Sequence, residues 1–173
     1  MIAHLTVAGI IHAALALLCL VAGLVQFLRP KRGAGHRARG YLYVYAMLVA
    51  DAASLLVYRF TGHFNVFHLA AIVNFTLIVL AIVPMLRTPR PSNWRRTHYY
   101  FIAWSYVSPV SAGLTNIAAR LLPVTTREQV GLIALVVSLM TMTIASILIR
   151  KHQPPSDAPT PSAGLVEQSG APS

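Results

Sequence analysis

The stretch HLTVAGIIHAALALLCLVAGLVQFL, residues 4–28, is followed at once by Arg29-Pro30-Lys31-Arg32. A helix needs about 20 mostly apolar residues to cross a membrane, because the hydrocarbon core is about 30 Å thick and each residue adds about 1.5 Å. The stretch meets this length, exceeds the apolar core of a signal peptide, and has no Lys or Arg in front of it. We therefore expect a permanent membrane-spanning helix that ends at a basic, proline-containing boundary.

The rest of the chain repeats this pattern. Of the 173 residues, 56% are hydrophobic and 10% are charged, whereas a soluble domain is about one-quarter charged. The single cysteine excludes an intrachain disulfide framework. Four further apolar segments are expected to span the membrane, at residues 40–60, 64–86, 98–122 and 128–149.

This pattern predicts an all-α integral membrane protein with five transmembrane helices. The short connections favour an up-down bundle of the first four helices, with the fifth packed on its flank. The transmembrane domain is expected to cover residues 1–151. Residues 152–173 are rich in Pro, Ser and Ala, which is typical of a disordered tail.

The basic residues fall mostly on one side of the predicted spans. Short loops rich in Lys and Arg stay in the cytoplasm, so we expect the N-terminus outside and the C-terminus in the cytoplasm. The net charge of +10 then reflects topology, and the expected partner is the lipid bilayer rather than nucleic acid. Of the 14 Lys and Arg, three lie on the outer side, and the eleven on the inner side are Arg29, Lys31, Arg32, Arg37, Arg39, Arg87, Arg90, Arg95, Arg96, Arg150 and Lys151.

Four histidines form two pairs at matched depths. On the helical rise, His12 and His68 lie about 24 and about 27 Å from the cytoplasmic ends of their spans, toward the outer face. His36 and His98 precede the second and fourth spans at the cytoplasmic mouth. Each pair joins helices that are diagonal in an up-down bundle, and facing imidazoles can supply both axial ligands of a haem iron. The pattern predicts two b-type haems, the outer on His12 and His68 and the inner on His36 and His98.

Five other polar residues share the faces of these histidines or lie within the spans. Asp51 is the one acidic residue well inside a span. We expect it to relay protons or pair with a charge, or else to be a protonated carboxyl bonded to a neighbouring helix. Arg59 lies two turns further out on the same helix, too far for direct pairing. Tyr43, Asn116 and Arg120 complete the candidates, and polar groups at the far ends of these faces could meet haem propionates.

Other functions stay open on the same residues. Small, polar and histidine side chains also serve helix packing and the membrane interface, which would give a non-catalytic accessory subunit with structural histidines. Asn74 and Asn116 suit interhelical hydrogen bonds. A copper or zinc site built from His4, His12, His63 and His68 is a further alternative, although His63 and His68 are five residues apart and cannot share a face of one regular helix. A small-molecule or metal transporter that uses Asp51 is another. An interfacial belt, or a place for a quinone to stack, is expected at Trp94, Tyr99, Tyr100 and Trp104.

With these residues, the chain resembles a bacterial family of small predicted membrane proteins of unknown function. The resemblance rests on His12, the segment 31–40 with His36-Arg37-x-x-Gly40, His68 and His98, and it covers roughly residues 5–120. It implies a multi-pass protein of the bacterial inner membrane, and places the fifth helix outside the family. The arrangement of the four histidines on the predicted helices is also similar, at the level of fold, to that in the dihaem membrane domains of cytochrome b561 and ferric reductases. This second likeness implies transmembrane electron transfer with a quinol or another redox partner.

The charge asymmetry yields a direct test of topology. A reporter fused after Ser173 should behave as cytoplasmic, and a reporter inserted at Thr125 as external, because the positive-inside rule fixes both ends of the last span. Paired alkaline phosphatase and fluorescent-protein fusions measure this. External activity of the Ser173 fusion would contradict the orientation and exchange the levels of the two histidine pairs.

Overall fold

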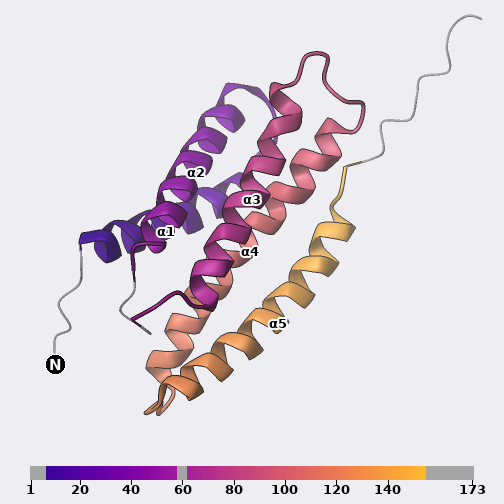
Figure 1. The fold of residues 1–173 in the computed structure, drawn as a ribbon. Coiled ribbons are helices and arrows are strands. Elements are labelled where there is room, and N and C mark those ends of the chain that lie inside the picture. Colours follow the sequence, from indigo (N-terminus) through magenta and orange to yellow (C-terminus); the bar gives the residue numbers. More distant parts are fainter. Residues whose placement is uncertain (1–6, 58–61, 155–173) are drawn as a thin grey trace, which may run out of the picture.

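The computed structural model describes residues 7–57 and 62–154, and in these residues it contains five helices and no strand. Consecutive helices run in opposite directions along the molecule (Figure 1). The chain begins with α1 and α2, which form one pair, and continues through α3 and α4 to α5. Their bounds are α1 Val7–Leu28, α2 Gly33–Ser54, α3 Val66–Leu86, α4 Trp94–Leu121 and α5 Arg127–Lys151.

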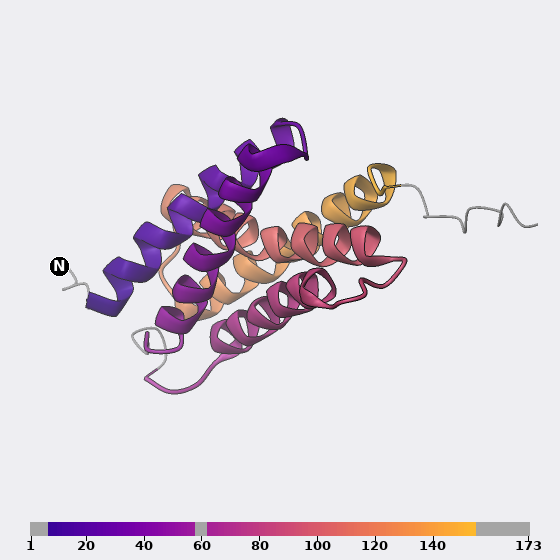
Figure 2. The same cartoon turned by 90° about the horizontal axis from the view of Figure 1, so that it is seen from above.

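The helices pack in a fixed order. Helix α1 contacts α2 and α4, and α3 contacts the same two helices. Within the described residues, α1 and α3 make no close backbone contact, and neither do α2 and α4. Helix α5 contacts α4 alone and lies along its outer side (Figures 1 and 2). The described chain is therefore a four-helix group with one flanking helix.

The first turns of α2 differ from the expected loop. The helix begins at Gly33, seven residues before the apolar segment that was predicted to start at Gly40. Gly33 has φ +77, a left-handed conformation that glycine adopts without strain, and it reverses the chain directly after Arg32. The residues that follow contain no proline, so the helix runs through the basic segment. It ends at Ser54, before the predicted residue 60, and residues 58–61 lie outside the described part of the chain.

Three of the five helices have the composition of membrane spans. Helices α1, α3 and α5 are long and apolar enough to cross a bilayer. Large apolar side chains are exposed along all three, as Leu17, Leu69 and Leu135 illustrate. Such a surface fits a hydrocarbon surrounding rather than water. Helices α2 and α4 are more polar and aromatic, and they bury tyrosine, serine and aspartate side chains inward.

The core lies where α1, α2, α3 and α4 meet. Its buried members include Cys19, Tyr43, Met47 and Ile78. Gly23 on α1 lies against the ring of Tyr106 on α4, and a Cβ at position 23 would overlap that ring. The hydroxyl of Tyr106 donates a hydrogen bond to the Leu20 carbonyl at 2.7 Å. A residue without a side chain is therefore what lets α1 and α4 approach.

This close approach predicts the effect of an added methyl group. Gly23→Ala should lower the free energy of unfolding by about 1–3 kcal/mol, the usual cost of overpacking, because the ring of Tyr106 has to move. A thermal-shift assay in detergent measures the loss. Gly131→Ala on α5 is the matched control, since nothing lies within 4 Å of a Cβ there. Equal melting temperatures for the two variants would contradict the proposed contact.

Candidate functional site

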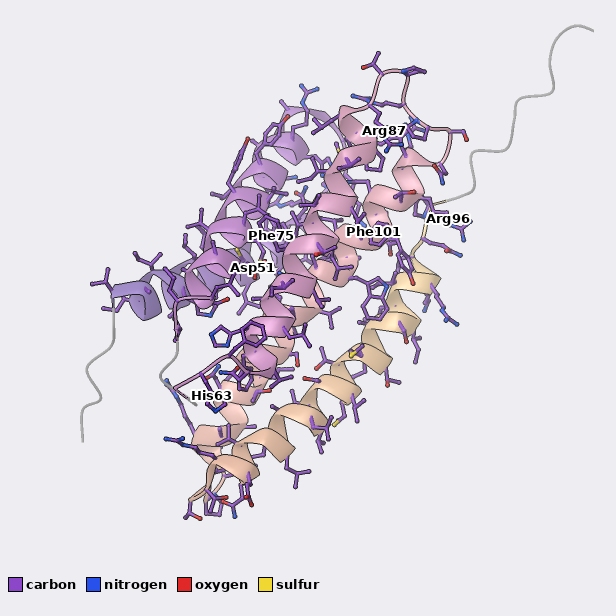
Figure 3. The ribbon with its side chains drawn as sticks, in the orientation of Figure 1. Asp51, His63, Phe75, Arg87, Arg96 and Phe101 are labelled. Carbon is purple, nitrogen blue, oxygen red and sulfur yellow. The ribbon has the colours of Figure 1, made fainter. Side chains whose placement is uncertain are left out.

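The basic connections all lie at one end of the molecule. Figure 1 shows the α1–α2 connection, the α3–α4 connection and the end of α5 together, opposite the α4–α5 connection. We call this the basic end; it is formed by residues 29–39, 87–96 and 150–151. Figure 3 shows Arg87 and Arg96 there, His63 toward the other end, and Asp51 between them. The polar groups described next run from this end inward.

His98 lies in the first turns of α4, at the basic end. Its Nδ1 is 3.0 Å from the carbonyl oxygen of Ala81 on α3. A carbonyl only accepts, so Nδ1 must carry the proton and donate it. The neutral ring is therefore the tautomer with its proton on Nδ1 and its lone pair on Nε2. Metal-bound histidines adopt this tautomer when Nδ1 bonds a backbone carbonyl.

His36 lies in the first turn of α2 and is held differently. The Nδ1 of His36 is 2.6 Å from the amide nitrogen of Gln26, and that nitrogen also donates to the His36 carbonyl at 3.0 Å. The Gln26 oxygen accepts from Nε of Arg39 at 3.0 Å, which fixes the orientation of the amide. The Nδ1 of His36 is therefore an acceptor, and the neutral ring carries its proton on Nε2.

His12 on α1 repeats the arrangement of His98. Its Nδ1 donates to the carbonyl oxygen of Ala50 on α2 at 2.9 Å, which leaves the lone pair on Nε2. The ring is half-buried. Two of the four predicted histidines are thus anchored to a carbonyl of a neighbouring helix.

His68 has a local structural role in α3. It is 2% exposed, and its Nδ1 accepts a hydrogen bond from the backbone N–H of Asn65 at 3.2 Å. The Asn65 side chain accepts from Phe67 in return, which completes a reciprocal cap at the start of the helix. The ring also stacks on Phe64, with 5.1 Å between centroids. His68 therefore stabilises the start of α3, and its neutral imidazole carries the proton on Nε2.

The histidines lie at two levels along the bundle. On α2, fourteen residues separate His36 from Ala50, the partner of His12, and on α3 thirteen residues separate His68 from Ala81, the partner of His98. Each separation is about 20 Å on the helical rise. Between the levels, the Tyr43 hydroxyl lies 3.0 Å from the Ser105 hydroxyl, which joins α2 to α4 across the core. The two levels are separated by packed protein.

Asp51 has a partner on the neighbouring helix α3. The Nδ2 of Asn74 donates to Oδ2 of Asp51 at 3.0 Å, and both side chains are buried, at 1% and 8% exposed. The expectation that Asn74 makes an interhelical hydrogen bond is confirmed. This contact corresponds to the alternative in which the Asp51 carboxyl is bonded to a neighbouring helix. It leaves Oδ1 of Asn74 buried without a hydrogen bond.

The remaining candidates lie apart from these levels. Asn116 and Arg120 are exposed, and the Asn116 amide donates to its own helix at the Ala112 carbonyl. Tyr43 belongs to the core rather than to the end of a face. Arg59 and His4 lie outside the described residues. Within the described residues, no group of three or more His, Cys, Asp or Glu is arranged to hold a metal ion directly.

Comparison with known proteins places these features in a family. The family model described as "Predicted membrane protein (DUF2306)" matches residues 9–150. The chain belongs to this family. The match includes all of α5 up to Arg150, so the expectation that the fifth helix lies outside the family is wrong. No curated protein and no solved structure matches the chain.

Sequence reasoning missed several partners in the family member described here. Gln26 is not among the candidate residues of the sequence, although it holds His36. The spacing of Asn65 and His68 resembles a capping box, in which Glu or Gln normally stands three residues after the cap, and this signal could have been found. The carbonyls of Ala50 and Ala81 could not be found from the sequence, because every residue has a backbone carbonyl and the sequence does not mark which one accepts a hydrogen bond.

The Asp51–Asn74 contact predicts non-additive mutations. Asn74→Leu should lower the free energy of unfolding by about 1–3 kcal/mol, since it leaves a buried carboxyl without its donor. Asp51→Leu combined with Asn74→Leu should lose less than the sum of the single changes. Reversible unfolding in mixed micelles measures the cycle. Asn116→Leu, at an exposed amide, serves as the control, and strictly additive losses for the pair would contradict the coupling.

Proposed function

We propose that this protein is a b-type membrane cytochrome that passes electrons across the bilayer through two bis-histidine haems. The observation that carries the proposal is the pair of Nδ1–H to carbonyl hydrogen bonds at His98 and His12. These bonds present an Nε2 lone pair at each of two levels about 20 Å apart along the helices. A second histidine is available at each level, His36 at the inner level and His68 at the outer level.

The four side chains fit haem ligation to different extents. His12 and His98 already have the tautomer in which Nε2 can bind iron. His36 and His68 would fit only after a change of tautomer. In each ring Nδ1 now accepts from an N–H group, so the neutral imidazole carries its proton on Nε2. Nε2 could bind iron only if Nδ1 carried the proton and donated it to an acceptor instead. For His36 this exchange requires the Gln26 amide to turn, and that amide is bonded to Arg39. Haem would supply reversible one-electron chemistry at these positions.

The chain's own residues have separate tasks in this proposal. Ala81 and Ala50 orient the imidazoles through their carbonyls, and the Tyr43–Ser105 hydrogen bond keeps the two levels apart. Arg39 bonds the same Gln26 amide as His36 and is a cationic side chain that could pair with a carboxylate of a bound cofactor. A quinol is the candidate electron donor, and a small molecule outside the membrane is the candidate acceptor.

The orientation proposed here puts the basic end in the cytoplasm of a bacterial cell, with the protein in the inner membrane. Eleven of the 14 basic residues lie at this end, as expected from the positive-inside rule. The His36–His98 level is then cytoplasmic and the His12–His68 level external. In this proposal α2 and α4 span the membrane with the three apolar helices, their polar faces turned into the bundle.

An accessory subunit with structural histidines is the competing proposal. It is favoured by the cap that His68 forms with Asn65 and by the hydrogen bonds that His36 makes with Gln26. Transport of a small molecule or metal through Asp51 is a further alternative. The observation that favours it is the buried Asp51–Asn74 hydrogen bond, which is the only polar contact described between α2 and α3.

The visible spectrum separates the first two proposals. Protein purified from haem-supplied cells and reduced with dithionite should show a sharp b-type absorption. His98→Ala and His12→Ala should each remove about half of it, because each change removes a ligand of one haem of two. The double variant should be colourless while remaining folded by circular dichroism.

Controls are available in the same chain. His63→Ala and His152→Ala should keep the full absorption, since both side chains are exposed and each bonds a nearby backbone carbonyl. A colourless wild-type protein, or a spectrum unchanged in the His98→Ala and His12→Ala variants, would overturn the cytochrome proposal and favour structural histidines.

A further inference from the structure

An apolar groove of about 470 Å³ lies between α4 and α5 at the basic end. It arises because α5 packs on α4 alone and is fastened at two points. One is the Ser111–Ser138 hydroxyl contact at 2.9 Å, and the other is the hydrogen bond from the Tyr99 hydroxyl to the Ile149 carbonyl at 3.1 Å. Between and beside these points the two helices present apolar walls to each other.

The walls and the mouth of the groove differ in chemistry. The walls are formed by aliphatic and aromatic side chains, among them Tyr106, Val110, Ala145 and Leu148. The groove is open along one side. At the basic end, Lys31 and His152 stand at its mouth. The site is therefore amphipathic, with an apolar channel that leads to a cationic group.

Among the described residues, Lys31 contacts aromatic rings at this mouth rather than an acidic side chain. Its Nζ lies 5.2 Å from the ring centroid of Tyr99 and 5.6 Å from that of Phe27, so the ammonium group is placed over two aromatic faces. The chain has four acidic residues, and the two in the described part are Asp51 in the bundle core and Glu128 in the first turn of α5. Glu128 begins the helix whose other end carries His152. Within the described residues, the positive charge at the mouth is thus left for an anionic ligand to neutralise.

We propose that this groove binds one anionic phospholipid, with an acyl chain between α4 and α5 and the phosphate at Lys31. The volume lies within the range of about 300–1,000 Å³ that is typical of ligand sites. Lipid is the surrounding solvent of the exposed apolar helices, and an unpaired lysine at a membrane surface favours anionic headgroups. The proposal does not depend on haem.

The experiment compares two lipids on the purified, delipidated full-length protein. Native mass spectrometry in detergent should show one retained phosphatidylglycerol, bound more tightly than phosphatidylcholine. Lys31→Gln should weaken the binding of phosphatidylglycerol about fivefold, the effect of one cationic side chain at a membrane surface. Ala145→Trp should remove the first bound molecule of both lipids, because the indole fills the groove.

Arg90→Gln is the matched control. Arg90 lies at the same end, with its guanidinium 5.1 Å from the Trp94 ring centroid, but it does not line the groove. This variant should bind phosphatidylglycerol as the wild type does. If Ala145→Trp does not fold, the comparison of Lys31→Gln with Arg90→Gln still decides the question.

Four outcomes would overturn the proposal. They are equal retention of both lipids by the wild type, equal weakening by Lys31→Gln and Arg90→Gln, displacement of the lipid by excess inorganic phosphate alone, and a dimer or a co-purified neutral quinone that Ala145→Trp removes. The third would indicate an anion site without an acyl channel, and the fourth would identify a second copy or a quinone as the occupant.

Discussion

Hydrocarbon cannot hydrogen-bond a polar side chain, so polar groups inside this bundle need partners within the protein, and several of these partners lie on another helix. Tyr43 meets Ser105, Asp51 meets Asn74, and His12 and His98 reach backbone carbonyls of α2 and α3. Each contact fixes the rotation of a helix about its axis as well as its neighbour. The polar faces of α2 and α4 turn inward for this reason, and the apolar faces of α1, α3 and α5 are left outward.

Helix α5 is attached in a different way. Ile149 is the only buried side chain of α5. Two hydrogen bonds described between α5 and α4 take the place of a shared polar core. A helix held so sparingly leaves unfilled space along its partner, which is the groove that ends at Lys31. The family match nevertheless extends through α5. The helix therefore belongs to the basic architecture of the family, and its loose packing is compatible with lipid as part of the interface.

The number of helices could be predicted from the sequence because hydropathy is a local property. The start of α2 could not, because Arg37 and Arg39 were interpreted as loop residues, whereas Gly33 already turns the chain and the charges extend from helical turns. The histidine contacts were even less accessible. Spacing could place His98 at a level, but the atom that holds it belongs to the backbone of Ala81 on another helix, and backbone atoms have no sequence signature. Long-range partners depend on helix rotation, which sequence periodicity determines only to within a face.

The histidines of this bundle are held in two ways, which differ in the hydrogen bond made by Nδ1. Where Nδ1 donates to a carbonyl, as in His12 and His98, the ring is held in place and Nε2 keeps its lone pair. Where Nδ1 accepts, as in His36, holding the ring removes the lone pair from Nε2. Ligation at the inner level would therefore compete with the Gln26–Arg39 hydrogen bond. If haem were bound as proposed, stability and cofactor binding would be coupled at His36 and independent at His98, and Gln26 would be the residue at which the structural role and the proposed redox role oppose each other.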